Sequence, residues 1–240
     1  MKKNLIWVLF IFLFIISPVL AEQKYKVIKI IDGDTIYVDF NNNGIPEQDE
    51  KVRLNGIDTF ETKLNEGLKW QMKNNSFTQD EALGLGYYGK EFAKKQLLNK
   101  YVTATNTADT KTDNHNRQLM SVYYDNGKNY EQEVLKAGLA TVYKKSNIAQ
   151  DLYKYENPAK IKANAQKTHH LHLVLLNKKT GKYHKITCEY GQMATDVELI
   201  NKPLIKYAPA NCCYIIKHKD IEKPIPDIHT DFIDIFINRH

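Results

Sequence analysis

Apolar residues recur along the first part of the chain in a pattern that favours strands. From Tyr25 to Phe40 they alternate imperfectly with lysines, and the stretch is rich in the β-branched and aromatic residues that are common in strands. A short polar segment, Asp32–Thr35, interrupts the run, and its glycine predicts a bend or a bulge. Similar stretches follow later in the chain. The further predicted strands cover 51–54, 101–107 and 118–124.

Helical periodicity begins later in the chain. The segment from Thr62 to Gly86 is polar and has little periodicity, so we predict a long, mobile loop there. Beyond it, apolar residues are spaced for one face of a helix, and Pro158 is expected to kink or divide the last helical stretch. The predicted helices begin at Tyr88 and cover 130–138 and 148–166.

The order of these elements separates two fold classes. The first strands follow one another directly, whereas a parallel α/β sheet needs a crossover helix between successive strands. We therefore predict a mainly β fold with helices, of the α+β class, built as a small OB-like barrel. After about Lys167 the pattern changes to short apolar runs, beginning with a strand-like stretch at 169–176, and all three cysteines follow. The predicted domains are a barrel at 24–167 and a small α+β Cys/His module at 168–240.

The N-terminus has the layout of a secretory signal peptide. Two lysines precede an apolar run from Leu5 to Ile16, which Ser17-Pro18 ends before a small residue at Ala21. The run is shorter than the roughly 20 apolar residues of a membrane span. We predict cleavage after residue 21 and a secreted or periplasmic monomer without stable membrane association. The formal net charge of +6 favours polyanionic partners, although solubility explains it better on the charge alone.

Acidic residues stand close to the predicted strand ends in two groups, Asp32 with Asp34 and Asp58 with Glu61. Asp34 and Asp58 come from different strands and can converge on one cation, to which the Thr59 carbonyl can add a neutral oxygen. No histidine or thiol accompanies them. An oxygen-only set suits calcium better than zinc.

Two arginines, Arg53 and Arg117, are candidate phosphate ligands. Each guanidinium can hold phosphate oxygens bidentately and stabilise the charge that develops during phosphodiester cleavage. Arg53 precedes Asp58 by five residues. On an ideal strand this odd spacing places the two side chains on opposite faces. A bend at Asn55-Gly56 can reverse the alternation, so the spacing leaves their convergence open.

In their order and spacing these residues resemble the staphylococcal nuclease family. The resemblance covers about 24–167 and implies a five-stranded OB-fold barrel of the nuclease type. It rests on Ile31-Asp32-Gly33-Asp34-Thr35, on Arg53-Leu54-Asn55-Gly56-Ile57-Asp58-Thr59-Phe60-Glu61, on Asn116-Arg117, and on two supporting matches, Tyr88-Gly89-Lys90-Glu91 and Ala137-Gly138-Leu139-Ala140.

The resemblance also implies an activity and a role for each residue. It implies a calcium-dependent nuclease (a hydrolase and endonuclease) that acts on DNA and RNA and leaves 3′-phosphates. The implied calcium ligands are Asp34, Asp58 and the Thr59 carbonyl. The implied phosphate-binding residues are Arg53 and Arg117, and Glu61 is the implied general base or water-positioning residue.

The sequence departs from the family pattern beside the second arginine and the predicted base. Phe60 stands where the family has proline, and His115-Asn116 stands where it has tyrosine and glycine. We expect His115 and Tyr143 to contact the substrate, since histidine and tyrosine rings can stack on bases. Base stacking of this kind tolerates sequence, as a non-specific nuclease requires.

A second oxygen-rich motif lies between two predicted strands. Residues 39–50 match a calcium-loop pattern with oxygen ligands at positions one, three, five, seven and twelve and glycine at six. The flanks are strands rather than helices, and Pro46 stands where an aliphatic residue is usual. The alternative is an Asn/Gly-rich hairpin turn with incidental acids. The predicted ligands of this second calcium loop are Asp39, Asn41, Asn43, the Ile45 carbonyl and Glu50.

The C-terminal module leaves two alternatives open. A zinc site is compatible with the histidine and cysteine spacing, and a disulfide between Cys188 and Cys212 or Cys213 suits an exported protein. The conceivable zinc ligands are His184, Cys188, Cys213 and His218.

Two hypotheses compete with the exported nuclease. A barrel of this kind can serve as a non-catalytic binding module, although retention of both arginines and all three acids argues against it. The barrel can also be one part of a larger exported assembly, because the strand-like tail at 228–237 lacks an evident partner strand.

Overall fold

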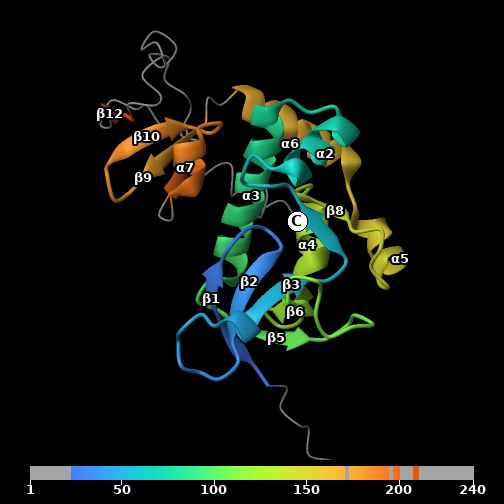
Figure 1. Cartoon of the computed structure of the whole chain (residues 1–240). Coiled ribbons are helices and arrows are strands. Elements are labelled where there is room, and N and C mark those ends of the chain that lie inside the picture. Colours follow the sequence, from blue (N-terminus) through green and yellow to red (C-terminus); the bar gives the residue numbers. More distant parts are fainter. Residues whose placement is uncertain (1–22, 171–172, 195–196, 201–207, 211–240) are drawn as a thin grey trace, which may run out of the picture.

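Figure 1 shows the computed structural model, which describes residues 23–170, 173–194, 197–200 and 208–210. Several sequence predictions lie outside the described residues: the signal peptide at 1–21, the tail at 228–237, and Cys212, Cys213 and His218. Within the described part of the chain, no helix is both long enough and apolar enough to span a membrane.

Five strands close into a barrel at one end of the molecule, and this confirms the predicted fold class. Antiparallel pairs join β2 to β3, β1 to β2, β1 to β5 and β5 to β6, and a parallel pair between β3 and β6 closes the ring. A two-residue strand, β7, pairs antiparallel with the end of β6. The strands are β1 (Tyr25–Ile30), β2 (Thr35–Asp39), β3 (Lys51–Leu54), β5 (Tyr101–Thr105), β6 (Gln118–Tyr124) and β7 (Lys128–Asn129).

The barrel interior is filled by the apolar positions that predicted the strands. Val27, Ile36, Val38 and Val52 are fully buried, and they share one hydrophobic core with residues of the helices around the barrel. Two short strands, β4 and β8, pair antiparallel beside the barrel. The elements that complete this part are η1 (Gln48–Glu50), β4 (Ile57–Thr59), α4 (Tyr130–Lys136), β8 (Ala140–Val142), α5 (Ala149–Leu152) and η2 (Tyr153–Tyr155).

The predicted loop over 62–86 was wrong, because most of it is helical. It contains α2 (Glu66–Asn75) and the first part of α3 (Gln79–Leu97), which begins well before the predicted start at Tyr88. Asn65 caps α2, and a capping box between Thr78 and Glu81 starts α3. Buried glycines weakened the helical pattern in α3. A Cβ at one of them, Gly86, would lie 2.2 Å from the carbonyl oxygen of Glu61, so close packing of α3 on this segment requires the glycine.

The predicted strand over 169–176 was also wrong in its first half. Helix α6 (Pro158–His170) extends through the first two of these residues, and β9 begins only at Val174. Ile161, Asn164, Ala165 and Thr168 are buried at helical spacing, so packing of this face on α3 extends the helix. Pro158 divides the helical stretch as predicted, since proline is well tolerated in the first turn of a helix.

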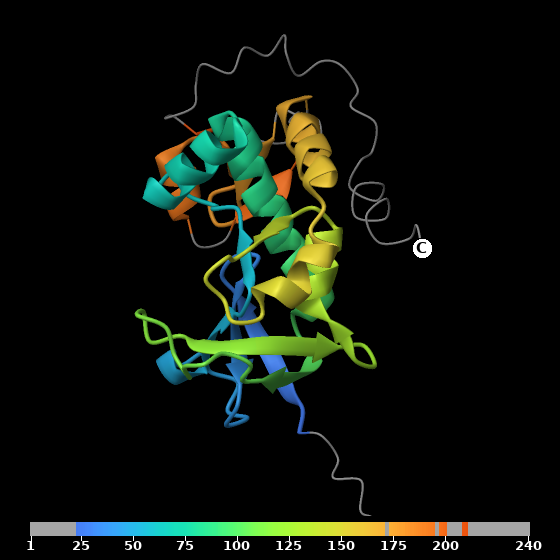
Figure 2. The same ribbon diagram turned by 90° about the vertical axis from the view of Figure 1, so that its right-hand side faces the viewer.

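The C-terminal segment forms a second, small sheet beside α3 (Figures 1 and 2). Its strands have the order β11-β9-β10-β12. Leu175 and Ile186 of this segment share a hydrophobic core with Leu68 of α2 and with Leu83 and Tyr87 of α3. The segment therefore packs on α2 and on the first part of α3, which the sequence did not predict. Its elements are β9 (Val174–Asn177), β10 (Lys182–Lys185), α7 (Glu189–Met193), β11 (Val197–Ile200) and β12 (Ala208–Pro209).

Two of the conceivable zinc ligands lie together in this segment. His184 Nδ1 is 3.5 Å from Cys188 Sγ, and burial lowers the pKa of His184. The other two, like both candidate disulfide partners, lie outside the described residues, so the choice between zinc and a disulfide stays a prediction.

Candidate active site

Arg53 of β3 lies between two carboxylates. Its Nη1 forms an ion pair with Asp34 Oδ1, and its Nη2 lies 2.9 Å from Asp58 Oδ1. The side chains are 14% exposed for Arg53, 6% for Asp34 and 30% for Asp58. Shielded charges need a partner of opposite sign. The single guanidinium of Arg53 contacts both of the acids that were predicted as cation ligands, so these three side chains keep one net negative charge.

The bend at Asn55-Gly56 brings Arg53 and Asp58 together, which the residue spacing had left open. Gly56 has a φ of +84°, and a Cβ there would lie 2.4 Å from Leu152 Cδ1, so the turn needs glycine on both counts. Across this bend, Arg53 Nη2 also donates to the Ile57 carbonyl at 3.0 Å. The guanidinium is thereby fixed on both sides of the turn.

Asp34 is tied to the strand on the far side of the same bend. Its Oδ2 accepts hydrogen bonds from the Thr59 backbone nitrogen at 2.7 Å and from Thr59 Oγ1 at 2.8 Å. Asp34 directly precedes β2, and Thr35 pairs with Arg53 in the β2–β3 register. Three strands therefore contribute to one small cluster of charged side chains.

Arg117 stands just before β6 and joins the same cluster through Thr35. Its Nε and Nη2 lie 2.7 and 2.6 Å from Asp113 Oδ2. Burial works against charge on Asp113, but hydrogen bonds from Arg117 and His115 outweigh it and lower the pKa of Asp113. Arg117 Nη1 donates to Thr35 Oγ1 at 3.3 Å, and that hydroxyl donates to Asp34 Oδ1 at 3.1 Å. A chain of contacts thus links the two arginines.

Glu61 follows β4 and is half-buried. Its Oε2 accepts a hydrogen bond from Asn65 Nδ2 at 2.9 Å. Burial is the largest cause of a raised pKa at Glu61; the hydrogen bond from Asn65 opposes it, and the charges of Asp32 and Asp58 raise it further. A raised pKa makes this carboxylate a stronger base near neutral pH than an exposed glutamate.

Gln71 of α2 is a site residue that sequence reasoning missed. Its Nε2 donates to the Thr59 carbonyl at 3.0 Å and to Asp58 Oδ2 at 3.4 Å, and its Oε1 accepts from the Glu61 backbone nitrogen at 3.0 Å. Gln71 is 5% exposed and lies one helical turn after buried Leu68. A polar residue on the buried face of a helix is the signal that would have found it, but the segment was predicted to be a loop.

Two clefts border these residues. One has a volume of about 550 Å³, and its lining includes Arg53, Arg117 and Tyr143. The other has a volume of about 1120 Å³, and its lining includes Asp58, Trp70 and Tyr143. Trp70 is 62% exposed and Tyr143 is 45% exposed, so both rings are accessible to a flat ligand.

The two predicted substrate-binding residues differ in their placement. Tyr143 borders both clefts, beside the basic side chains of the larger one. His115 is exposed on the turn before Arg117 and lines neither of these two clefts. The basic residues that line the larger cleft are Lys144, Lys145 and Lys162.

Comparison with known proteins agrees with this geometry. Residues 51–170 match the family model described as "Staphylococcal nuclease homologue". An "Uncharacterized endonuclease" of Escherichia coli O157:H7 is 30% identical over 161 residues, which are 67% of this chain and 86% of the relative. The chain belongs to the staphylococcal nuclease family.

Two further relatives are matched over a smaller part of their length. A "Thermonuclease" of Staphylococcus hyicus is 33% identical over 139 residues, which are 56% of this chain and 66% of the relative. An uncharacterised protein of Methanocaldococcus jannaschii is 35% identical over 130 residues, 51% of this chain and 60% of the relative. The chain thus spans less than two thirds of the length of these two relatives.

The chemistry of the donor set in this nuclease-family site fits a hard cation. Asp34, Asp58 and the Thr59 carbonyl offer only oxygens, and Gln71 and Thr59 contacts hold the three groups in one cluster. Among the described residues, no three His, Cys, Asp or Glu side chains form a cluster suited to a metal ion. The predicted set contains only two such side chains, because its third ligand is a backbone oxygen.

Proposed function

We propose that this chain is an exported, calcium-dependent nuclease that hydrolyses phosphodiester bonds in DNA and RNA. The observation that carries the proposal is the chain of contacts from Arg117 through Thr35 and Asp34 to Arg53 and Asp58. Membership of the staphylococcal nuclease family and the names "Thermonuclease" and "Uncharacterized endonuclease" of two relatives support the same activity.

The two arginines bind the scissile phosphate in this proposal. A phosphodiester carries one negative charge, and a second develops on its oxygens as water attacks. Arg53 and Arg117 both border the smaller cleft, where their guanidinium groups can donate to those oxygens. Calcium, held by Asp34, Asp58 and the Thr59 carbonyl, supplies positive charge that polarises the same phosphate.

Glu61 acts on the attacking water in this proposal, as its base or as the group that positions it. The water oxygen forms a bond to phosphorus, its proton passes to Glu61, and the bond from phosphorus to the 5′ oxygen breaks. The departing 5′ oxygen takes up a proton from solvent, and the 3′ side keeps the phosphate. The raised pKa of Glu61 favours this proton transfer.

In this proposal, exposed aromatic rings stack on unpaired bases without sequence selectivity. Trp70 and Tyr143 flank the larger cleft, and the lysines between them can track a phosphate backbone. The signal-like segment at 1–21 supports export, after which the chain would act as a monomer away from the membrane.

Degradation of plasmid DNA and RNA in calcium, compared with a chelator, tests this function. We expect cleavage only in calcium, and a loss of about 10²- to 10³-fold in rate for Arg117→Lys, which keeps the charge but loses the fork of donors. Lys128→Arg, at an exposed position on β7, is the matched control and should cleave at the wild-type rate. Binding of nucleic acid without any turnover would favour the non-catalytic alternative.

A further inference from the structure

The loop between β2 and β3 is folded around its own polar side chains. Asn41 Oδ1 accepts a hydrogen bond from the Asn43 nitrogen at 2.9 Å, and Asn43 Oδ1 accepts one from the Ile45 nitrogen at 2.7 Å. Each amide oxygen has a second lone pair that these bonds do not use. Gly44 has a φ of +73° in open space, so its backbone conformation, not crowding, requires glycine at the sixth position.

Asp39, the first residue of the loop pattern, carries a buried oxygen without a partner. The residue is 5% exposed, and its Oδ2 accepts a hydrogen bond from the Gly44 nitrogen at 3.1 Å. Its Oδ1 is buried and has no hydrogen-bond partner in the part of the chain that the structure describes. A buried carboxylate oxygen is costly unless a donor or a cation satisfies it.

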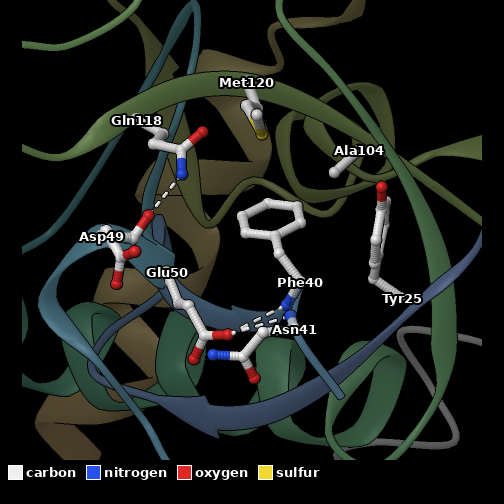
Figure 3. A pocket seen from close by; sticks show the side chains of 8 residues that line it. All are labelled: Tyr25, Phe40, Asn41, Asp49, Glu50, Ala104, Gln118 and Met120. Atoms are coloured by element: carbon white, nitrogen blue, oxygen red, sulfur yellow. Dashed lines mark hydrogen bonds between the residues drawn. The ribbon is translucent and has the colours of Figure 1, made fainter. Parts of the chain in front are cut away.

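Glu50, the twelfth residue of the pattern, is buried beside the start of the loop. It is 1% exposed, and its Oε1 accepts from the backbone nitrogens of Phe40 and Asn41 at 3.0 and 3.4 Å (Figure 3). Its Oε2 accepts from the Glu47 nitrogen at 3.3 Å. Among the described residues, no lysine or arginine forms an ion pair with Asp39 or Glu50.

The side chain at the ninth position, Glu47, contacts the side chains at the third and fifth positions. Glu47 Oε2 accepts from Asn41 Nδ2 at 2.8 Å, and its Oε1 accepts from Asn43 Nδ2 at 3.4 Å. Ile45, in contrast, turns its side chain to solvent with 61% exposed, so only its backbone can serve the loop. An incidental hairpin turn would leave its acids in water, whereas this loop buries two of them without a counter-charge.

We propose that residues 39–50 bind one calcium ion, separate from the ion of the active site. The ligands are the Asp39 and Glu50 carboxylates, the Asn41 and Asn43 amide oxygens and the Ile45 carbonyl, and Glu47 at the ninth position contributes through water. This set offers six or more hard oxygens, which is what calcium takes. The cation satisfies the orphaned Asp39 Oδ1 and balances two buried negative charges.

The bound ion connects the ends of the hairpin that carries Arg53. Asp39 is the last residue of β2, and Glu50 directly precedes β3. The last pair of that hairpin is Tyr37 with Lys51, two rungs from the pair of Thr35 with Arg53. Calcium in the loop therefore holds β2 and β3 in register. Its loss loosens the pairing of β3, the strand that carries Arg53.

Calorimetric titration with calcium chloride separates this site from the active site. The measurement uses the full chain carrying Asp34→Asn and Asp58→Asn, from which the two side-chain ligands of the proposed active-site ion are removed. We expect one calcium ion per chain to remain bound, and its affinity to fall at least about tenfold when Asp39→Asn is added. The added control Asp49→Asn removes the same charge at the neighbouring eleventh position and should change the affinity by less than about twofold.

Asn43→Ala provides a second test that spares the buried carboxylates. Asn43 is exposed, so its truncation should leave the far-ultraviolet circular dichroism in chelator unchanged while weakening calcium binding. Failure of the Asp34/Asp58 variant to bind calcium at millimolar concentration would overturn the proposal. Calcium binding that Asp39→Asn and Asn43→Ala leave unchanged would also overturn it. Neither result depends on whether the chain cleaves nucleic acid.

Discussion

The two ends of β2 each bury a carboxylate, and they neutralise it differently. Asp34, just before the strand, is 4% exposed and forms an ion pair with Arg53. Asp39, at the end of the strand, is 5% exposed and has no cationic side chain beside it among the described residues. The same strand thus presents one acid with an internal counter-ion and one without.

This difference distinguishes the candidate active site at Asp34 from the proposed structural calcium site at Asp39. In the candidate active-site cluster, Arg53 pairs with Asp34 and Asp58, so in our proposal an entering phosphate and cation meet charges that are already held in place. In the loop, our proposal leaves the charge for an external ion, which would then become part of the fold. Removing one charge should therefore change the free energy of unfolding differently at the two ends of β2. Loss of Arg53 should destabilise the fold, whereas loss of the Asp39 charge should change its stability little or increase it.

The largest expected effect is the loss of the shared counter-ion. Arg53→Ala leaves Asp34 without its ion-pair partner, and a broken buried pair typically costs about 3 to 5 kcal/mol of folding free energy. Urea denaturation in chelator measures this loss. Asp39→Asn under the same conditions should cost less than about 1 kcal/mol or should stabilise, because it removes an uncompensated charge. Equal losses of unfolding free energy in the two variants would contradict the distinction between Asp34 and Asp39.

Another buried carboxylate extends the comparison. Among the described residues it forms no ion pair, and it belongs to no proposed cation site. Glu131 is fully buried, and burial raises its pKa to about 8, against opposing hydrogen bonds that include one from the Val122 nitrogen. The folded state therefore keeps a proton that the unfolded chain loses above its ordinary value of 4.5. Stability is fully present below that value and is lost as the pH rises toward about 8.

The expected slope is up to about 1.4 kcal/mol for each pH unit inside this window. Thermal or urea unfolding between pH 5 and 8 (about three units of the window) measures it, with Glu131→Gln beside wild type. Gln at this position cannot titrate, so the stability of the variant should fall much less than that of wild type as the pH rises. A wild-type stability that rises across this range would show that Glu131 is ionised in the folded state.

Gln71 tests how the active-site end is held in place. Gln71→Ala removes the amide that holds both the Glu61 backbone and the Thr59 carbonyl. Small misplacements of a reacting group reduce rates by about 10²-fold. We expect kcat to fall by that order with KM little changed, whereas Lys73→Ala, exposed on the same helix, should behave as wild type. Steady-state kinetics on DNA distinguishes these outcomes, and a rise in KM alone would place Gln71 outside the positioning of Glu61.

The smallest expected effect lies at the rim of the larger cleft. Trp70→Ala removes a ring that is 62% exposed and can stack on a base. Stacking of one base contributes about 1 to 3 kcal/mol, and we expect the lower end at so exposed a position. KM for a single-stranded oligonucleotide should rise about fivefold with kcat unchanged. No change in KM would remove Trp70 from the substrate-binding surface.

Local sequence patterns predicted the strands of the barrel and several of its helices, but not α2 or the first part of α3. The strands can be predicted from the sequence because each is rich in β-branched and aromatic residues over a few positions. Helix α3 contains Gly84, Gly86 and Gly89, which lower its propensity, and it is stabilised by contacts with segments distant in sequence. Such contacts are invisible in a local pattern, and the same holds for the parallel β3–β6 pair that closes the barrel.

The sequence predicted which charged residues form the candidate site, but not the hydrogen bonds that connect them. The order of acids and arginines pointed to a cation and a phosphate, while the spacing of Arg53 and Asp58 left their convergence open until the structure showed the bend at Gly56. Thr35 and Gln71 link the charged groups to one another, and neither belongs to a residue type that a search for catalytic groups selects. Their roles follow from the fold, because α2 had to be helical before Gln71 could face the site.

Single-turnover cleavage of a short DNA oligonucleotide at saturating calcium tests the central claim most directly. The comparison is between wild type, Glu61→Gln and the matched control Glu66→Gln, whose carboxylate is 88% exposed on α2. We predict a rate about 10² to 10⁴ times lower for Glu61→Gln, with DNA affinity and the control unchanged. Wild-type cleavage by Glu61→Gln, or equal cleavage by wild type in chelator, would contradict the account of a calcium-dependent nuclease at this site.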